Sequence, residues 1–263
     1  MTPEDLQAAG LAYVVTGEVA VVTLDRPEAR NAQTPLTCRT LARIGEEIPD
    51  EVRVVVVRGR GQSFSAGLDR AMLDPLGGGD GVETVAGLLA LSDDEASAAI
   101  QEFQRGFTWL RDPSFVSVAV VHGHAIGAGF QLALACDLRV LADDAQLCMK
   151  EPALGLVPDL TGTQPLVAAV GYSRALEICA TGRYVSAEEA MAIGLANVVV
   201  PLAELDATVN DLVAALTAAP AGAVRETQAL LLGATDRPLE DQLRLEREAQ
   251  VRRFRDLAAM FAG

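Results

Sequence analysis

Two acidic residues in a loop rich in proline and glycine are the first candidates for chemistry in this sequence. Glu151 and Asp159 are eight residues apart in the segment MKEPALGLVPDLTGTQ, and their neighbours Leu154, Leu156, Val157 and Leu160 are apolar. A carboxyl group in apolar surroundings has a raised pKa and can act as a general acid or base. The pair is therefore a candidate proton-transfer site.

A second candidate is the segment GHAIGAGFQLALACD, in which glycines stand where a helix should begin. Glycine at such a point often allows a ligand to approach the backbone closely. A dinucleotide-binding loop would need a third glycine at Leu132, and a P-loop would need a lysine and a hydroxyl residue that do not follow. The remaining interpretation is a site for a negatively charged oxygen, bound by free N–H groups near Gly127 and Gly129.

The segment SFSAGLD resembles the nucleophile elbow G-x-S-x-G, with Ser65 as the nucleophile and Ser63 in place of the first glycine. The chain has two histidines, His122 and His124. One hypothesis is a catalytic triad of Ser65, His122 and an acid. The alternative is that both histidines only orient a tight turn by hydrogen bonding.

Composition restricts the class of protein. The chain has 263 residues and a formal net charge of -15, which argues against a nucleic-acid partner. Its apolar runs are shorter than the roughly 20 residues of a membrane-spanning helix, so no membrane partner is expected. Residues 1–10 lack the features of a signal peptide. The four cysteines have no metal-binding spacing, so we expect small buried residues in a reducing cytoplasm and no metal site.

The apolar pattern predicts an α/β chain. Residues 12–25 are typical of a β-hairpin, and Thr34 before Pro35 predicts the N-cap of a helix that ends at Pro49. Strand, strand and helix then recur about every 50 residues as far as position 200, which predicts stacked ββα units. Residues 138–149 are predicted to be one of these strand pairs.

Local signals add further predictions for individual segments. Segment 74–100 is rich in glycine and acidic residues, which predicts a mobile insertion that becomes helical after Ser92. Ser186 and Glu189 have the spacing of a capping box. After residue 201 the chain is predicted to be helical, and the arginines of its last helix indicate either a solvated face or contacts with another subunit or a phosphate.

Four segments, in this order and at these spacings, resemble the enoyl-CoA hydratase/isomerase family, also called the crotonase superfamily: LDRPEARNA, FSAGLD, VHGHAIGAGFQLALACDLRV and EPALGLVPDLTGTQ. The resemblance implies a crotonase-like spiral of ββα units with the acyl-CoA site over residues 1–200. A C-terminal helical trimerisation region over residues 201–263 would follow. The family also implies an acyl-CoA thioester substrate, no separate cofactor, and a homotrimer or a dimer of trimers.

The resemblance further implies an oxyanion hole, in which two backbone N–H groups bind the thioester oxygen while an enolate forms. These groups correspond here to Ala66 and Ala128. Stabilisation is needed because the α-proton of a thioester is weakly acidic, and loss of one donor typically costs about 10²- to 10³-fold in rate. Neighbouring residues are implied to bind the substrate: Ser65, Gly67, Leu68, Asp69, Gly127 and Gly129.

The acid–base residues differ from those of the family's hydratases, which use two glutamates to position and activate a water. Glu151 corresponds to the second glutamate, whereas Gln131 stands at the first and cannot take up a proton. The resemblance thus implies that Glu151 transfers the proton, with Asp159 as a second proton-transfer group in an isomerase. Gln131 would orient water or substrate. Pro165 also differs, because the family commonly has arginine there.

Several functions stay open from the sequence. The first is hydration or isomerisation at the double bond of an enoyl-CoA. The second is a dienoyl-CoA isomerase that uses Glu151 and Asp159, although those enzymes have aspartate where Gln131 stands. An aromatic-CoA dehalogenase with an aspartate nucleophile lacks its accompanying aromatic residues here. A non-catalytic acyl-CoA-binding protein is the alternative from another class.

Overall fold

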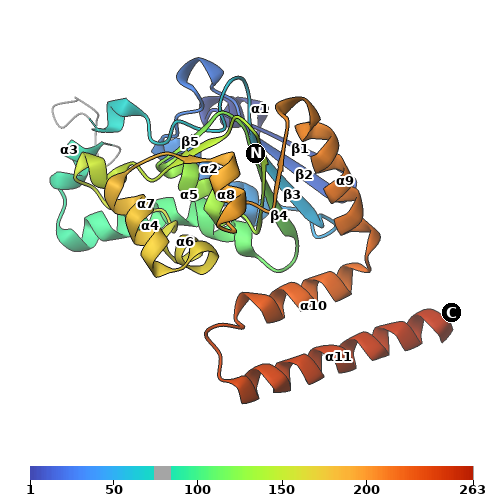
Figure 1. Ribbon diagram of the computed structural model, residues 1–263. Helices are drawn as coiled ribbons and strands as arrows, with labels where there is room; N and C mark the ends of the chain where they lie inside the picture. The colour runs from blue at the N-terminus through green and yellow to red at the C-terminus, as the bar shows by residue number, and fades with distance from the viewer. Residues whose placement is uncertain (74–83, 263) are drawn as a thin grey trace.

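Two β-sheets organise the computed structural model, which describes residues 1–73 and 84–262 (Figure 1). Within these residues the larger sheet has six strands in the order β1, β2, β3, β4, β6 and β9. β1 and β2 form the predicted antiparallel hairpin, and the other neighbours are parallel. The bounds are Leu11–Thr16 for β1, Val19–Leu24 for β2, Val54–Gly59 for β3, Val116–Val121 for β4, Leu138–Ala142 for β6 and Val198–Val200 for β9.

A smaller sheet contains β5 (His124–Ile126), β7 (Gln146–Cys148) and β8 (Val185–Ser186). β4 and β6 belong to the larger sheet, whereas β5 and β7, which follow them in the chain, belong to the smaller one. The strands predicted in 138–149 are therefore correct, but they do not pair with each other, because the chain changes sheet between them. This alternation produces the predicted ββα spiral.

Eleven helices surround the sheets in the described part of the chain. Five short 3₁₀ turns accompany them, of which the turn Glu151–Leu154 matters for the site. The helices are α1 Pro3–Ala8, α2 Pro35–Glu47, α3 Val85–Leu89, α4 Asp93–Thr108, α5 Ala128–Ala135, α6 Thr163–Val170, α7 Tyr172–Thr181, α8 Ala187–Ala192, α9 Leu205–Ala218, α10 Ala221–Leu232 and α11 Leu239–Ala262.

The predicted boundaries of α2 are confirmed. The Thr34 hydroxyl accepts a hydrogen bond from the N–H of Thr37 at 3.3 Å, and Pro35 is the first helical residue. Proline fits this position because the first N–H of a helix has no intrahelical partner. At the other end, Ile48 adopts an extended conformation, as a residue before a proline should.

The structure confirms one later prediction of a helix start and, at a second helix, confirms the N-cap residue but only half of the predicted capping box. α4 begins directly after Ser92, as predicted, while residues 74–83 of the predicted insertion lie outside the described residues. At α8 only half of the capping box forms: the Ser186 hydroxyl accepts from the N–H of Glu189 at 3.2 Å. The return bond is missing because the Glu189 carboxylate binds Arg183 at 2.7 Å instead.

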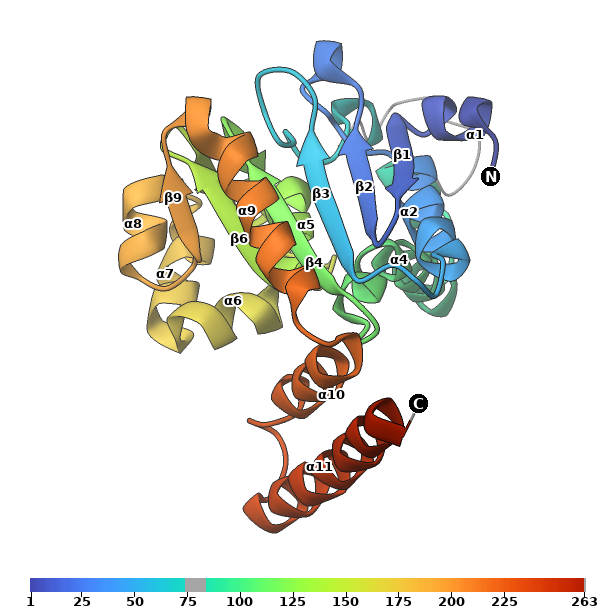
Figure 2. The ribbon, with the colours of Figure 1, turned by 90° about the vertical axis from the view of Figure 1, so that its right-hand side faces the viewer.

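β3 is buried on both faces, as its run of valines predicts. Val55 and Val57 face the core that includes α5, all of whose residues are buried. Val54 and Val56 face α9, which lies across the opposite side of the sheet (Figure 2). The helical region predicted from residue 201 therefore starts with a helix that covers the sheet.

Arg53 fixes the end of α9. Its guanidinium donates to the carbonyl oxygens of Thr217 at 2.7 Å and Leu216 at 3.4 Å, and also to that of Ala219. Because the C-terminal end of a helix carries partial negative charge, a guanidinium there satisfies free carbonyl groups and interacts favourably with the helix dipole. Arg53 thereby holds the turn into α10 against the sheet.

α10 and α11 extend away from the sheets as an antiparallel pair (Figure 2). Arg225 of α10 donates to the carbonyl oxygens of Ser114 and Asp50 at the edge of the core. Arg252 forms a bidentate ion pair with Glu226, which agrees with the solvated-face interpretation of the arginines. Several apolar side chains of α11 are also exposed: Leu239, Leu243, Val251, Phe254 and Leu257. The oligomerisation role of this region stays a prediction.

Two further predictions concern membranes and cysteines. Within the described residues no single helix has the length and apolar composition to cross a membrane. α9 and its preceding turn reach that threshold together with α10 only as a pair bent by 101°. All four cysteines are free, and they are buried or half-buried as predicted: Cys38, Cys136, Cys148 and Cys179.

Candidate active site

The 64–69 loop lies against the N-terminal end of α5. A parallel β-bridge joins Ser65 to Ala125 of β5, and another joins Leu68 to the loop before α2. The approach is close at Gly67, where a Cβ would lie 2.5 Å from a carbonyl oxygen and 3.5 Å from the backbone nitrogen of Ala128. Only glycine fits there, and its φ of +91° also favours glycine.

Two backbone N–H groups at this contact have no protein acceptor among the described residues: those of Leu68 and Ala128. Ala128 is the first residue of α5, so its N–H has no intrahelical partner. The other N–H groups of the loop are bound at 2.8–3.2 Å: Ser65 to the oxygen of His124, Ala66 to that of Arg30, Gly67 to Oγ of Ser65, and Asp69 to the oxygen of Gln33.

This pattern corrects one donor of the predicted oxyanion hole. The N–H of Ala66 already donates to the carbonyl oxygen of Arg30 at 2.9 Å, so it is not available to a substrate. Arg30 and Asn31 have φ values of +51° and +56°. The free N–H of the loop belongs to Leu68, which the sequence places only among the substrate-binding residues. The spacing of the motif does not reveal which way each N–H points.

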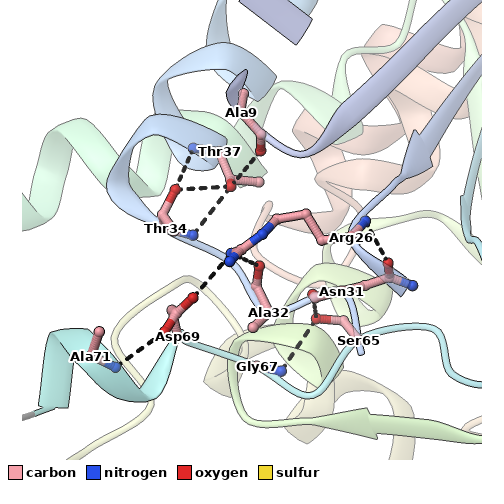
Figure 3. A network of polar contacts seen from close by, with 10 residues as sticks. All are labelled: Ala9, Arg26, Asn31, Ala32, Thr34, Thr37, Ser65, Gly67, Asp69 and Ala71. Carbon is pink, nitrogen blue, oxygen red and sulfur yellow. Dashed lines mark hydrogen bonds and ion pairs between the residues drawn. The ribbon is translucent and has the colours of Figure 1, made fainter. Parts of the chain in front are cut away.

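A network of polar contacts holds this loop from the side of residues 26–34 (Figure 3). Arg26 donates from Nη1 to Oδ2 of Asp69 at 3.0 Å. The Asn31 side chain accepts from the N–H of Arg26 at 2.9 Å and donates to carbonyl oxygens of Arg60, Ser63 and Phe64. Asp69, a predicted substrate-binding residue, therefore acts within the protein, where it anchors the residue next to Leu68.

The structure does not bring a serine–histidine triad together. Ser65 is fully buried, and its hydroxyl is hydrogen-bonded to other parts of the loop network. His122 lies 2.8 Å from the carbonyl oxygen of Gly61 through Nε2, and His124 packs edge-on against Tyr184. His122 thus fits the alternative interpretation of a histidine that orients a turn by hydrogen bonding, whereas the contact of His124 is with an aromatic ring.

Glu151 begins the 3₁₀ turn after β7 and places its carboxylate beside Gly127. A Cβ at Gly127 would lie 3.1 Å from Oε1, so this glycine makes room for the carboxylate. Oε1 accepts a hydrogen bond from Nε2 of Gln131 at 2.7 Å. Oε2 is buried without a hydrogen-bond partner in the described residues, and the whole side chain is only 8% exposed. Because an unpaired buried carboxylate oxygen is costly, Oε2 is the candidate proton-transfer atom.

Gln131 is fully buried on α5 and its orientation is fixed. Oε1 accepts from the N–H groups of Leu160 at 2.8 Å and Gly162 at 3.1 Å. Nε2 must therefore face Glu151, because only the amide oxygen can accept those two bonds. Gln131 thus holds Glu151 and the following loop in place, which the prediction of a water- or substrate-orienting role did not include.

The pKa values of the two candidate carboxyl groups are both shifted. Burial raises the pKa of Glu151, the hydrogen bond from Gln131 opposes this, and the negative charge of Asp159 raises it further. Burial also raises the pKa of Asp159, which is half-buried. Its backbone oxygen accepts from Gln104 of α4 at 2.6 Å. The structure therefore brings the two carboxyl groups of the loop within electrostatic reach of each other.

The apolar residues between the two carboxyl groups do not cause this burial. Leu154, Leu156 and Val157 are exposed, with Val157 at 72%. The low exposure of Glu151 instead comes from its contact with Gly127 and α5. Leu160, directly after Asp159, is buried, so one of the four apolar neighbours named from the sequence does surround the pair. Both carboxyl groups are desolvated, and their role in proton transfer stays a prediction.

A separate cavity of about 520 Å³ lies on the α9 side of the sheet, away from these groups. Arg58 and Arg60 line it, and both are already paired, with Asp206 and Asp25 at 2.8 Å. This cavity has no buried unpaired group comparable to Oε2 of Glu151 among its described lining residues. The N–H pair beside Gly67 is therefore the better candidate site.

The fold, the paired N–H groups and the buried glutamate agree with a known family. The chain matches the family model described as Enoyl-CoA hydratase/isomerase over residues 15–259, and it belongs to this family. The crotonase fold expected from the four sequence segments is thereby confirmed.

Individual relatives match along nearly the whole chain. A Thermus thermophilus protein with an enoyl-CoA hydratase name is 35% identical over 238 residues, covering 89% of this chain and 88% of its own. The (E)-benzylidenesuccinyl-CoA hydratase of Thauera aromatica is 33% identical over 242 residues, covering 86% and 83%. A Thermobifida fusca protein crystallised with acetoacetyl-CoA is 54% identical with a TM-score of 0.93, covering 97% of this chain and 98% of that one.

Proposed function

We propose that this protein moves protons at the double bond of an enoyl-CoA thioester. The thioester oxygen binds between the N–H groups of Leu68 and Ala128, and Oε2 of Glu151 is the base. The unpaired N–H groups beside a buried, unpaired carboxylate oxygen are the observation that carries this proposal. The acetoacetyl-CoA bound by the Thermobifida fusca relative supports an acyl-CoA ligand.

The reaction follows from these positions. Glu151 removes the α-proton of a β,γ-unsaturated acyl group, and the electrons of the C–H bond pass into a dienolate whose charge rests on the thioester oxygen. The two N–H groups stabilise that charge, and the dipole of α5 adds to the effect. Glu151 then returns the proton to the γ-carbon, which leaves an α,β-unsaturated thioester.

Gln131 favours this isomerisation over hydration. Hydration needs one group to activate water and another to protonate carbon, and an amide does neither. Nε2 of Gln131 is engaged with Glu151, and its oxygen with two backbone N–H groups. We therefore expect one carboxylate to carry the proton, with hydration slow because Glu151 alone would have to perform both steps.

A dienoyl-CoA isomerase is the second candidate function, favoured by Asp159. The charge of its half-buried carboxyl group raises the pKa of Glu151. In this reaction Glu151 takes a proton from one carbon, and Asp159 gives a proton to a more distant carbon.

The proposal also covers assembly and location. Exposed apolar side chains on α11 support a homotrimer or a dimer of trimers. We further propose a cytoplasmic location.

Incubation with short β,γ-enoyl-, α,β-enoyl- and dienoyl-CoA thioesters in heavy water separates the reactions. Isomerisation moves the double bond, detected by absorbance, without adding the mass of water. Hydration adds that mass. Glu151→Gln, which keeps shape and hydrogen bonding, should abolish either reaction. Tight binding of every thioester without turnover would overturn the enzyme proposal in favour of a binding protein.

A further inference from the structure

We propose that Ser65 is a positioning residue whose hydroxyl group fixes the N–H groups of Leu68 and Ala128 relative to each other. The proposal rests on the proposed function, because it concerns the donors of the oxyanion hole. It also gives the elbow-like segment SFSAGLD a role that neither a nucleophile nor a substrate contact explains. The hydroxyl lies between the loop that carries Leu68 and the helix that carries Ala128.

On the loop side, the hydroxyl controls the peptide group just before Leu68. Oγ of Ser65 accepts from the N–H of Gly67 at 3.2 Å and from Nε2 of Gln33 at 3.1 Å. It donates to the carbonyl oxygen of Asn31 at 2.8 Å. The N–H of Gly67 thus turns inward, and the N–H of Leu68 is left as the free donor of the loop.

On the helix side, the same side chain packs against the residue after Ala128. A Cβ at Gly129 would lie 2.7 Å from Cβ and 2.9 Å from Oγ of Ser65, so glycine allows this contact. The carbonyl oxygen of Ser65 also accepts from the N–H of Ile126 at 3.0 Å. One fully buried residue therefore contacts the backbone on both sides of the donor pair.

These bonds use the whole hydrogen-bonding capacity of the hydroxyl, which has one hydrogen and two lone pairs. A nucleophilic role would require the hydroxyl to give up its proton to a base, and neither histidine bonds to it. Without the hydroxyl, the N–H of Gly67 and the oxygen of Asn31 would be buried and unpaired, which favours a rearranged loop. The orientation of the Leu68 N–H would then be lost.

Ser65→Ala removes the hydroxyl, and Ser65→Cys keeps a weaker donor and acceptor in case the alanine variant does not fold. Ser117→Ala is the matched control: Ser117 is equally buried on β4, and its hydroxyl donates to the carbonyl oxygen of Leu110 at 2.5 Å. Measurements are kcat and KM, urea unfolding, and the infrared stretch of a ¹³C-labelled thioester carbonyl in bound butanoyl-CoA.

We expect Ser65→Ala to lower kcat about tenfold or more, up to the 10²- to 10³-fold typical of a lost oxyanion donor, with KM changed less than threefold. The carbonyl stretch, lowered when wild-type protein binds butanoyl-CoA, should return toward its value in water. Ser65→Cys should be intermediate. Ser117→Ala should lose stability while it keeps kcat and the carbonyl shift.

An unchanged carbonyl shift in the Ser65 variants, or a kcat loss that Ser117→Ala reproduces, overturns the positioning role. An acyl group found covalently on Ser65 by mass spectrometry also overturns it. Failure of the proposed function has a different signature, because the wild-type protein would then neither turn over an enoyl-CoA nor shift the carbonyl of butanoyl-CoA.

Discussion

The amide group of Gln131 joins Glu151 to the loop that follows it: Nε2 donates to Oε1 of Glu151 at 2.7 Å, while Oε1 of Gln131 accepts from the N–H groups of Leu160 and Gly162. The hydrogen bond to Glu151 favours the ionised carboxylate and restrains its orientation. In the proposed reaction Gln131 therefore acts through Glu151, and Oε2 of Glu151 is left as a buried carboxylate oxygen without a partner in the described residues.

Gln131→Glu should create hydration activity. A carboxylate at this position can still accept from Leu160 and Gly162, and its second oxygen would face Oε1 of Glu151 within hydrogen-bond distance. Two carboxylates this close share one proton, which supplies an acid and a base together. Incorporation of ¹⁸O from labelled water into an α,β-enoyl-CoA should rise at least about tenfold over the wild-type rate. Gln131→Met, which cannot donate a hydrogen bond and accepts one only weakly, should lose both reactions. Equal ¹⁸O incorporation in Gln131→Glu and wild type contradicts this account.

Asp159→Asn should move the acidic limb of the pH profile to lower pH. The charge of Asp159 raises the pKa of Glu151, so its removal lowers that pKa, and the base form of Glu151 then persists at lower pH. The measurement is kcat/KM against pH for a β,γ-enoyl-CoA. Asp94→Asn, on the exposed first turn of α4, is the control and should leave the profile unchanged. A shift to higher pH would show that Asp159 does not act on Glu151 through its charge.

The same variant tests the second candidate function. If Asp159 transfers a proton in dienoyl-CoA isomerisation, Asp159→Asn should lose at least about 10²-fold in kcat on a dienoyl-CoA, the usual minimum for general acid–base catalysis. Activity on a mono-enoyl-CoA should fall far less. Equal effects on both substrates would exclude a separate role of Asp159 as a proton donor.

Gly127→Ala should impair both stability and activity. The residue has a φ of +52°, and a Cβ would lie 3.1 Å from Oε1 of Glu151. We expect a loss of about 1–3 kcal/mol in the free energy of unfolding from backbone strain and a tenfold or larger loss of kcat from displacement of the carboxylate. Gly17→Ala is the matched control, because Gly17 has a φ of +56° with open space around it. It should lose stability and keep kcat.

Arg53→Met should destabilise the fold by about 1.5–3 kcal/mol, because it removes charged hydrogen bonds to carbonyl groups at the end of α9. Arg58→Met removes an exposed ion pair with Asp206 and should cost less than about 1 kcal/mol. Urea unfolding of both variants checks the difference. Similar losses would mean that the cap on α9 contributes little.

The sequence predicted the elements well where local chemistry decides them. Thr34 before Pro35 and the valines of β3 define a helix start and a two-sided buried strand without any tertiary information. It did not predict that β6 and β7 join different sheets, because an apolar pattern marks a strand without naming its neighbour. The half-formed capping box at Ser186 has a similar cause: Arg183 competes for Glu189.

The candidate site was predicted at the level of segments and acidic residues, while its donors were not fully predicted. Glu151, Asp159 and Gln131 lie together as expected from the family resemblance. Leu68 replaces Ala66 as the candidate donor because of the direction in which single N–H groups point. The N–H of Ala66 points to the carbonyl oxygen of Arg30, a residue in the left-handed conformation. Residue types and spacing do not contain that direction.

The parallel bridge between Ser65 and Ala125 has one more consequence. The segments that lead to Leu68 and Ala128 are joined by this isolated bridge, three residues before each donor, so their separation there is that of adjacent strands, about 4.8 Å. Backbone geometry thus helps to fix the position that we propose for the thioester oxygen. Exchange of the surrounding side chains can change which carbon gains or loses a proton, while the proposed binding position of the thioester oxygen stays the same.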